Sequence, residues 1–280
     1  MMLTLGFSPC PNDTFIFDAL VNGGIDTGDL RFEPVLEDVE TLNRWASEEK
    51  LHITKLSYSA FLHLADRYAL LRSGSALGRG VGPLLLSRAP LLADIDLATW
   101  LKSARIAIPG KQTTANLLLS LAFPAANNKT ELLFSDIEAA VLTGEYNAGL
   151  VIHESRFTYA ARGLNKLLDL GDWWEKETGT AIPLGGICAR RDLPPDVVLR
   201  IDELLRQSIG MGWKRHPQLS PYVVQHAQEM SEDVMRQHIA LYVNEHTTDL
   251  GEEGERAVQT LFAKAVEAGV ITEIPEKIFV

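Results

Sequence analysis

Residues 149–159, GLVIHESRFTY, place a histidine directly after a short apolar run. The run predicts a buried strand, so His153 would lie at the end of that strand and just before a helix. Burial at this place would favour the neutral, proton-accepting imidazole near pH 7. His153 is therefore a candidate general base, although a histidine at a strand end is more often structural or solvated. Glu154 is a poor orienting partner, because neighbours on a strand point to opposite faces.

Three more segments combine a strand end with a helix start. They are SPCPNDT (8–14), TKLSYS (54–59) and PGKQTTA (109–115). The first turn of a helix leaves amide N–H groups unpaired, and these bind carboxylate or phosphate readily. Lys55 adds a charge beside Ser57, and Thr113 and Thr114 add hydroxyls. For any one of these serines and threonines, a role as a helix cap only is the better interpretation. Two such loops facing one cleft would instead predict a site for a small anion.

Other kinds of site have weaker support. The remaining histidines show no HxH or HExxH spacing and accompany no cysteine cluster, which disfavours a metal site. Residues 74–82, GSALGRGVG, lack the glycine order of nucleotide-binding loops, so a flexible or tightly turning cleft wall is the better interpretation. Cys10 could be a nucleophile near a helix start or a packing residue. Trp173 and Trp174 could line an aromatic site, but core packing is the commoner role.

The composition points to an ordinary globular protein inside the cell. The chain has 280 residues, a net charge of −11 and 46% hydrophobic residues. This acidic balance argues against a nucleic-acid surface, and an anionic substrate would need a local lysine or helix N-termini. Only two cysteines occur, and we find neither a signal peptide nor an apolar run of the roughly 20 residues that span a bilayer. We therefore expect a cytoplasmic protein that does not bind membranes.

Strand and helix patterns alternate through the first two-thirds of the chain. The expected strands are 2–7, 31–36, 52–56, 105–109 and the run before His153. Asn12 or Asp13 is expected to cap the helix that follows the first strand, and Asp38 the next helix. From Pro195 onward the pattern is helical.

The alternation of strand and helix patterns begins again after residue 104, and this predicts two lobes. GPLLLSRAP and GGICARRD (185–192) have a similar pattern and are expected to be two crossings between the lobes. We predict an α/β protein with a larger lobe, 1–88 plus 189–280, and a smaller lobe, 89–188. In such folds a ligand binds at the carboxyl ends of the strands, here in a cleft between the lobes.

Seven segments together resemble the 1,4-dihydroxy-6-naphthoate synthase family of the futalosine route to menaquinone. They are GFSPCPNDTFIF, EPVLEDVETLN, TKLSYSA, LRSGSALGRGVGPLL, PGKQTTA, AGLVIHESRFTY and GEEGERAV, spread over essentially the whole chain. The resemblance implies the two-lobed fold of type II periplasmic binding proteins. It also implies a cytoplasmic lyase without metal or organic cofactor, acting on cyclic dehypoxanthinyl futalosine.

The resemblance also implies roles for individual residues. His153 matches the family's proton acceptor, and Lys55, Leu56, Ser57, Thr114 and Ala115 match its substrate-contacting positions. We then expect His153 to take a proton from a hydroxyl or from a carbon beside the ketone. Amides and hydroxyls at Ser57 or Thr114–Ala115 would stabilise the negative charge that develops on oxygen. Lys55 would hold the substrate carboxylate, or would be only the structural partner of an acid.

The rival hypothesis is a cytoplasmic binding or sensor protein for a small aromatic or hydroxy carboxylate. The two-lobed fold commonly captures solutes, and fold alone does not decide between the two functions. The oligomeric state does not follow from the sequence.

Overall fold

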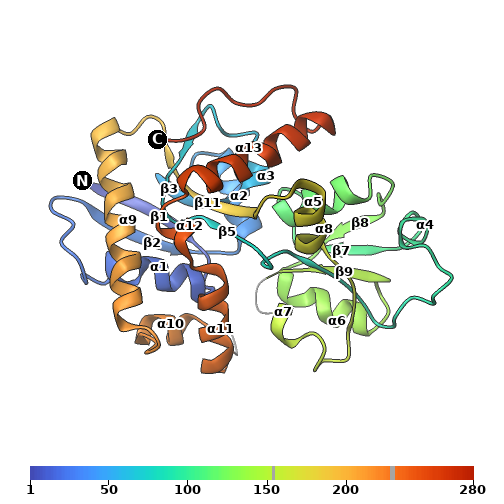
Figure 1. Ribbon diagram of the computed structural model, residues 1–280. Coiled ribbons are helices and arrows are strands. Elements are labelled where there is room, and N and C mark those ends of the chain that lie inside the picture. Colours follow the sequence, from blue (N-terminus) through green and yellow to red (C-terminus); the bar gives the residue numbers. More distant parts are fainter. Residues whose placement is uncertain (153–154, 228–230) are drawn as a thin grey trace. The chain divides into compact units, whose positions relative to one another are not determined.

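The computed structural model describes residues 1–152, 155–227 and 231–280 (Figure 1). The chain divides into two units, Met1–Gly78 with Pro183–Val280, and Arg79–Ile182. The divisions fall before the expected boundaries at 88 and 188. β6 (Leu84–Ser87) pairs within the sheet of the second unit, whereas β11 (Ile182–Arg190) pairs within the sheet of the first. Each segment therefore belongs to the unit whose sheet completes its hydrogen bonds.

The first unit is built on a six-stranded mixed sheet in the described part of the chain. Its strands are β1 (Met2–Phe7), β2 (Arg31–Leu36), β3 (Ile53–Ser57), β4 (Tyr68–Leu70), β5 (Ala76–Gly78) and β11. The order is β2-β1-β3-β11-β4, and β5 also pairs with β11. β1 runs parallel to both β2 and β3, while β11 is antiparallel to β3. The parallel strands β1 and β3 therefore end at the same edge of this sheet.

Helices cover this sheet, and they dominate the C-terminal part of the chain as the sequence predicts. They are α1 (Pro11–Val21), α2 (Val39–Ser47), α3 (Tyr58–Phe61), α9 (Pro195–Arg215), α10 (Pro221–His226), α11 (Glu232–Tyr242), α12 (Glu245–Thr248) and α13 (Gly251–Glu267). α1 packs against α9, α10 and α11. Phe7 of β1 stacks on Phe17 of α1 within the core, with ring centroids 4.4 Å apart.

The second unit is a five-stranded sheet with its own core. Its strands are β6, β7 (Ile106–Ile108), β8 (Lys129–Glu131), β9 (Ala148–Val151) and β10 (Asn165–Asp169), in the order β10-β6-β9-β7-β8. Its helices are α4 (Leu97–Leu101), α5 (Thr114–Ala122), the 3-10 helix η1 (Phe134–Asp136), α6 (Ile137–Leu142), α7 (Ser155–Thr158) and α8 (Leu170–Thr178). The predicted α/β class, with two sheets and a helical C-terminal region, is confirmed.

The helix caps show where local rules succeed and where they fail. Asp38 caps α2 as predicted, because its carboxylate accepts from the amides of Glu40 and Thr41 at 3.0 and 3.1 Å. The prediction for α1 is wrong, because that helix already begins at Pro11 with Cys10 as its N-cap. Proline fits the first helical turn, where its missing N–H costs nothing. The carboxylate of Asp13 is consequently available for contacts outside the helix.

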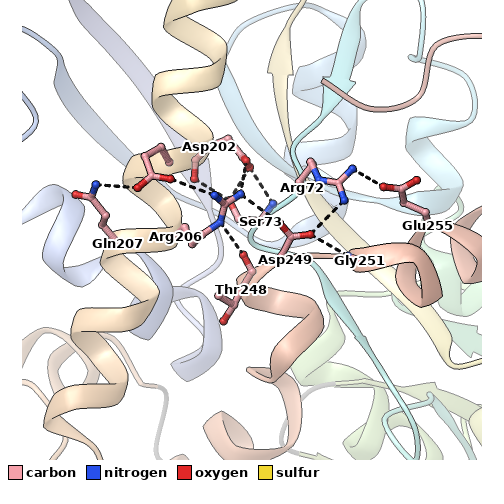
Figure 2. A network of polar contacts seen from close by, with 10 residues as sticks. Arg72, Ser73, Asp202, Arg206, Gln207, Thr248, Asp249, Gly251 and Glu255 are labelled. Carbon is pink, nitrogen blue, oxygen red and sulfur yellow. Dashed lines mark hydrogen bonds and ion pairs between the residues drawn. The ribbon is translucent and has the colours of Figure 1, made fainter.

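A polar network ties the C-terminal helices to the segment between β4 and β5 (Figure 2). The buried Asp202 of α9 accepts from the amide and the hydroxyl of Ser73, at 2.9 and 2.7 Å. Arg206 bridges Asp202 and Asp249, at 3.0 and 3.4 Å. Arg72 extends the network from Asp249 to Glu255 of α13. Residues far apart in the sequence are thus joined within the first unit.

We predict that Asp202→Ala lowers the free energy of unfolding by about 2–4 kcal/mol, because it leaves the buried Ser73 amide without an acceptor and Arg206 without its buried partner, although the Ser73 hydroxyl can still donate to the backbone carbonyl of residue 202. Urea titration followed by circular dichroism measures the loss. Glu203→Ala is the matched control, since Glu203 also contacts Arg206 but its side chain is 46% exposed. The control should change stability by less than about 1 kcal/mol. Equal losses in both variants would show that the Ser73 contacts contribute little.

Candidate functional site

Two polar loops meet at the carboxyl edge of the first sheet. β1 ends at Phe7 and is followed by α1, while β3 ends at Ser57 and is followed by α3. The buried Asp13 and Lys55 face each other there, with Lys55 Nζ 2.8 Å from Asp13 Oδ1. The structure therefore joins the segments 8–14 and 54–59, which the sequence marked separately. This edge is where α/β sheets commonly bind ligands.

The Asp13 carboxylate collects four hydrogen bonds in an almost completely buried position. Its Oδ1 accepts from Lys55 and from Asn12 Nδ2 at 2.8 and 2.9 Å. Its Oδ2 accepts from the amide and the hydroxyl of Ser8 at 3.1 and 2.8 Å. These contacts fix the loop that leads from β1 into α1.

The electrostatics of the pair follow from these contacts. Burial by itself would raise the pKa of Asp13, but the charge of Lys55 and the hydrogen bonds from Lys55 and Ser8 outweigh it, so that the pKa is lowered. Asp13 is thus ionised at neutral pH and compensates the charge of Lys55. Of the two roles expected for Lys55, the partnership with an acid is observed.

Ser57 is held by a residue that the sequence did not single out, Asn43 of α2. The Ser57 amide donates to Asn43 Oδ1 at 3.0 Å, and Asn43 Nδ2 donates to Ser57 Oγ at 3.1 Å. The expectation that the Ser57 amide stabilises a substrate oxygen is therefore wrong, because Asn43 already occupies that N–H. The hydroxyl remains as the hydrogen-bond donor that Ser57 can offer.

Leu56 lies between these two polar residues and points the other way. Side chains alternate along a strand, so Lys55 and Ser57 share one face of β3 while Leu56 is on the opposite face, with no exposed area. The side chain of Leu56 is part of the packed interior. A contact with substrate at this position would have to use its backbone.

Thr114 and Ala115 form the first turn of α5 in the second unit. The preceding residue Thr113 caps this helix: its hydroxyl donates to the Gly110 carbonyl at 2.8 Å and accepts from the Asn116 amide at 3.2 Å. Asn116 in turn donates to the Lys111 carbonyl at 2.9 Å. Hydrogen bonds from Thr113 and Asn116 thus fix the loop between β7 and α5.

Lys129 of β8 supports the same helix through two neutral side-chain oxygens. Its ammonium donates to Asn116 Oδ1 and to Ser120 Oγ at 3.1 and 2.6 Å. Burial lowers its pKa from the usual lysine value. Polar oxygens therefore hold a cation beside the first turns of α5.

His153, the candidate general base, lies outside the described residues. β9 ends at Val151, two residues before it, which agrees with the predicted strand end. After it, Arg156 of α7 donates to the Gly82 carbonyl at 2.7 Å and to Asp169 Oδ2 at 2.5 Å. The segment that follows His153 is thus anchored within the second unit.

The expected site residues thus fall into separate groups. Lys55, Leu56 and Ser57 belong to the first unit, whereas Thr114 and Ala115 belong to the second. The structure brings Lys55 and Ser57 to one edge of the first sheet. The site that would unite both groups stays a prediction.

Several weaker candidates take structural roles. Trp174 is fully buried, and its indole N–H donates to the Ala181 carbonyl at 3.1 Å, so it is a core residue. Gly82 packs directly on Gly171, where an added Cβ would come within 2.2 Å of the Gly171 nitrogen. This close approach supports the interpretation of residues 74–82 as a tightly turning wall. Cys10, the candidate nucleophile or packing residue, is 5% exposed and is the N-cap of α1.

Residues 1–152, 155–227 and 231–280 hold no cluster of three or more potential metal-ligating side chains. No helix in these ranges is long and apolar enough to cross a bilayer.

Comparison with known proteins identifies relatives over nearly the full length. A family model described as menaquinone biosynthesis matches residues 3–267. A 1,4-dihydroxy-6-naphthoate synthase of Thermus thermophilus is 50% identical over 278 residues, 99% of each chain. A second synthase, of Streptomyces coelicolor, is 42% identical and aligns over 96% of this chain and 94% of its own.

Solved structures agree on the fold. A protein from Archaeoglobus fulgidus superposes with a TM-score of 0.90 at 34% identity, over 96% of this chain and 98% of its own. The periplasmic aliphatic sulphonate binding protein of Escherichia coli gives a TM-score of 0.66 at 11% identity, over 100% of this chain and 93% of its own. The predicted likeness to periplasmic binding proteins is confirmed as a likeness of fold.

We predict that Asp13→Asn lowers the free energy of unfolding by about 3–5 kcal/mol, because Lys55 then remains buried without a counter-charge. Asp18→Asn is the matched control on the same helix, since Asp18 pairs with the more exposed Arg215. It should cost less than about 1 kcal/mol. The double variant Asp13→Asn/Lys55→Met should recover much of the loss. Equal effects of both single variants in urea titration would contradict this assignment.

The lowered pKa of Asp13 predicts a specific dependence on pH. A carboxyl whose folded-state pKa lies below its unfolded value of about 3.9 contributes stability above that pH and loses it as the pH falls through the folded pKa. The stability difference between the wild type and Asp13→Asn should therefore be constant near neutral pH and should shrink in acid. Thermal melts of both proteins between pH 7 and pH 3 measure it, and a difference that grows in acid would have the wrong sign.

Proposed function

This chain belongs to the 1,4-dihydroxy-6-naphthoate synthase family of menaquinone biosynthesis, and we propose that it converts cyclic dehypoxanthinyl futalosine into 1,4-dihydroxy-6-naphthoate. The observation that carries the proposal is the 50% identity to a named synthase over 99% of both chains. The cytoplasm is the expected compartment, and no metal or organic cofactor is part of the proposal.

The proposed reaction begins with His153 as a general base. Its imidazole takes a proton from a hydroxyl or from a carbon beside the ketone of the substrate. The electron pair left behind drives cleavage of a carbon–carbon bond, which releases the three-carbon sugar fragment. Formation of the second aromatic ring makes the reaction favourable.

Two groups in the described part of the chain can donate hydrogen bonds to the substrate oxygens in this reaction. The Ser57 hydroxyl can donate to an oxygen on which negative charge develops, and the first turn of α5 at Thr114 and Ala115 favours an anion. Lys55 is buried and paired with Asp13, so its charge is already compensated. We therefore assign the contacts with substrate oxygens to Ser57 and the first turn of α5. Lys55 is assigned the role of orienting the loop after β1 through its pair with Asp13.

Binding of a small carboxylate without turnover is the second candidate function. The observation in its favour is the fold shared with a periplasmic sulphonate-binding protein. That likeness has 11% identity, whereas the named synthases share 50% and 42% with this chain. The enzyme proposal is therefore preferred, and formation of naphthoate separates the two.

We predict that His153→Ala lowers kcat by about 100-fold or more, because a positioned general base contributes roughly 10²–10⁴ to the rate. Naphthoate formation, followed by absorbance, measures turnover, and substrate binding should persist. His63→Ala, at an exposed histidine of the first unit, is the control and should keep wild-type turnover. Added imidazole should restore part of the activity of His153→Ala. Wild-type turnover in that variant would exclude His153 as the base.

A further inference from the structure

We infer that Asn43 is a positioning residue that turns the Ser57 hydroxyl into a hydrogen-bond donor for a substrate oxygen. This inference rests on the proposed function. It adds that the Ser57 hydroxyl donates, and does not accept, the hydrogen bond to the substrate oxygen. Asn43 is a buried amide side chain on α2 that the sequence pattern did not mark as functional. Asn43 has no exposed area, and Ser57 is 4% exposed.

The orientation of the Asn43 amide follows from its neighbour. A backbone N–H can only donate, so the atom that faces the Ser57 amide at 3.0 Å must be the carbonyl Oδ1. The other end of the same side chain is therefore the NH₂ group. It points to Ser57 Oγ at 3.1 Å and to Glu40 Oε2 at 3.3 Å. Glu40, as a carboxylate acceptor, fits the same orientation.

This orientation leaves one direction for the Ser57 proton. A hydroxyl can donate one hydrogen bond and accept others. Asn43 Nδ2 donates to Ser57 Oγ, so that contact uses the acceptor side of the hydroxyl. Within the ranges that the structure describes, Ser57 Oγ accepts one hydrogen bond, from Asn43, and no group accepts its proton. The hydroxyl is left to donate to a ligand.

The place of Ser57 makes this donor useful. Ser57 is the last residue of β3, at the sheet edge where Asp13 and Lys55 also lie. A buried donor that is fixed before the ligand arrives stabilises negative charge on oxygen without reorganisation. The chain Glu40–Asn43–Ser57 therefore prepares one contact to a carboxylate, carbonyl or enolate oxygen of the substrate.

Asn43→Asp is the informative variant because it keeps the shape of the side chain. One carboxyl oxygen still accepts from the Ser57 amide. The other faces both Ser57 Oγ and Glu40 Oε2, so the two neighbouring carboxyls share one proton between them and the oxygen at residue 43 accepts the hydroxyl proton instead of donating. The donor is thereby taken from the ligand. Proton–nitrogen NMR of the Ser57 amide should show that its hydrogen bond persists in Asn43→Asp and is lost in Asn43→Ala.

The decisive measurement is a double-mutant cycle with Ser57→Ala. We expect Asn43→Asp and Ser57→Ala each to lower kcat/KM by about 10- to 1,000-fold, the range for a lost oxyanion donor. The double variant should be no worse than the poorer single variant, because Asn43 acts through Ser57. Ser47→Ala is the control on α2, since its hydroxyl contacts the Asn43 carbonyl at 3.4 Å and not its side chain. It should stay near wild type. Losses that multiply in the double variant would overturn the inference.

A second readout separates this inference from the proposed function. 2-Naphthoate, which has the carboxylate and aromatic rings but no reactive ketone, is titrated against the same four proteins of the cycle. If the wild type produces no naphthoate but binds this probe, and both single variants lose that binding without further loss in the double variant, the proposed function fails and the inference stands. In a wild type that lacks turnover, unchanged probe binding in Asn43→Asp, or no binding at all, would overturn the inference; in a wild type that turns over, the kcat/KM cycle decides.

Discussion

A buried lysine at the end of a strand imposes the main constraint on the first unit. Lys55 is 6% exposed, and a charge removed from water to this extent must be compensated by a partner and by hydrogen bonds. The ion pair with Asp13 meets this need only if the loop after β1 folds back over the end of β3. Ser8 and Asn12 then complete the coordination of the carboxylate. One electrostatic requirement thus fixes the path of the chain around the candidate site.

The sequence predicts elements better than it predicts the contacts between them. The strand expected at 31–36 matches β2 at its observed bounds, and Asp38 is read correctly as a cap because capping is a local interaction. Asp13 was misread as a cap because its true partner, Lys55, is 42 residues away. The sequence could mark both residues as polar groups near strand ends. It could not pair them, because pairing depends on which strands are neighbours in the sheet.

Asn43 shows the same limit more sharply. It lies in α2 beside the buried Leu42, and a polar residue beside the apolar face of a helix was the one signal available. Its role depends on the Ser57 amide, whose single possible hydrogen-bond direction orients the Asn43 side chain. The family resemblance supplied Ser57 as a contact position, but it said nothing about which way the hydroxyl proton points. That information comes from three-dimensional hydrogen-bond geometry.

The interrupted order of the first unit has a consequence for protein synthesis. Its sheet needs β11, and its polar network needs Asp202 and Asp249, all of which follow the second unit in the chain. The ribosome therefore releases all of residues 79–182 while the first unit still lacks its antiparallel strand β11 and the helices that cover its core. The inserted unit can fold first, during translation. Until β11 is synthesised, the strands of residues 1–78 keep apolar surface exposed. Chaperone protection during this interval matters most for residues 1–78.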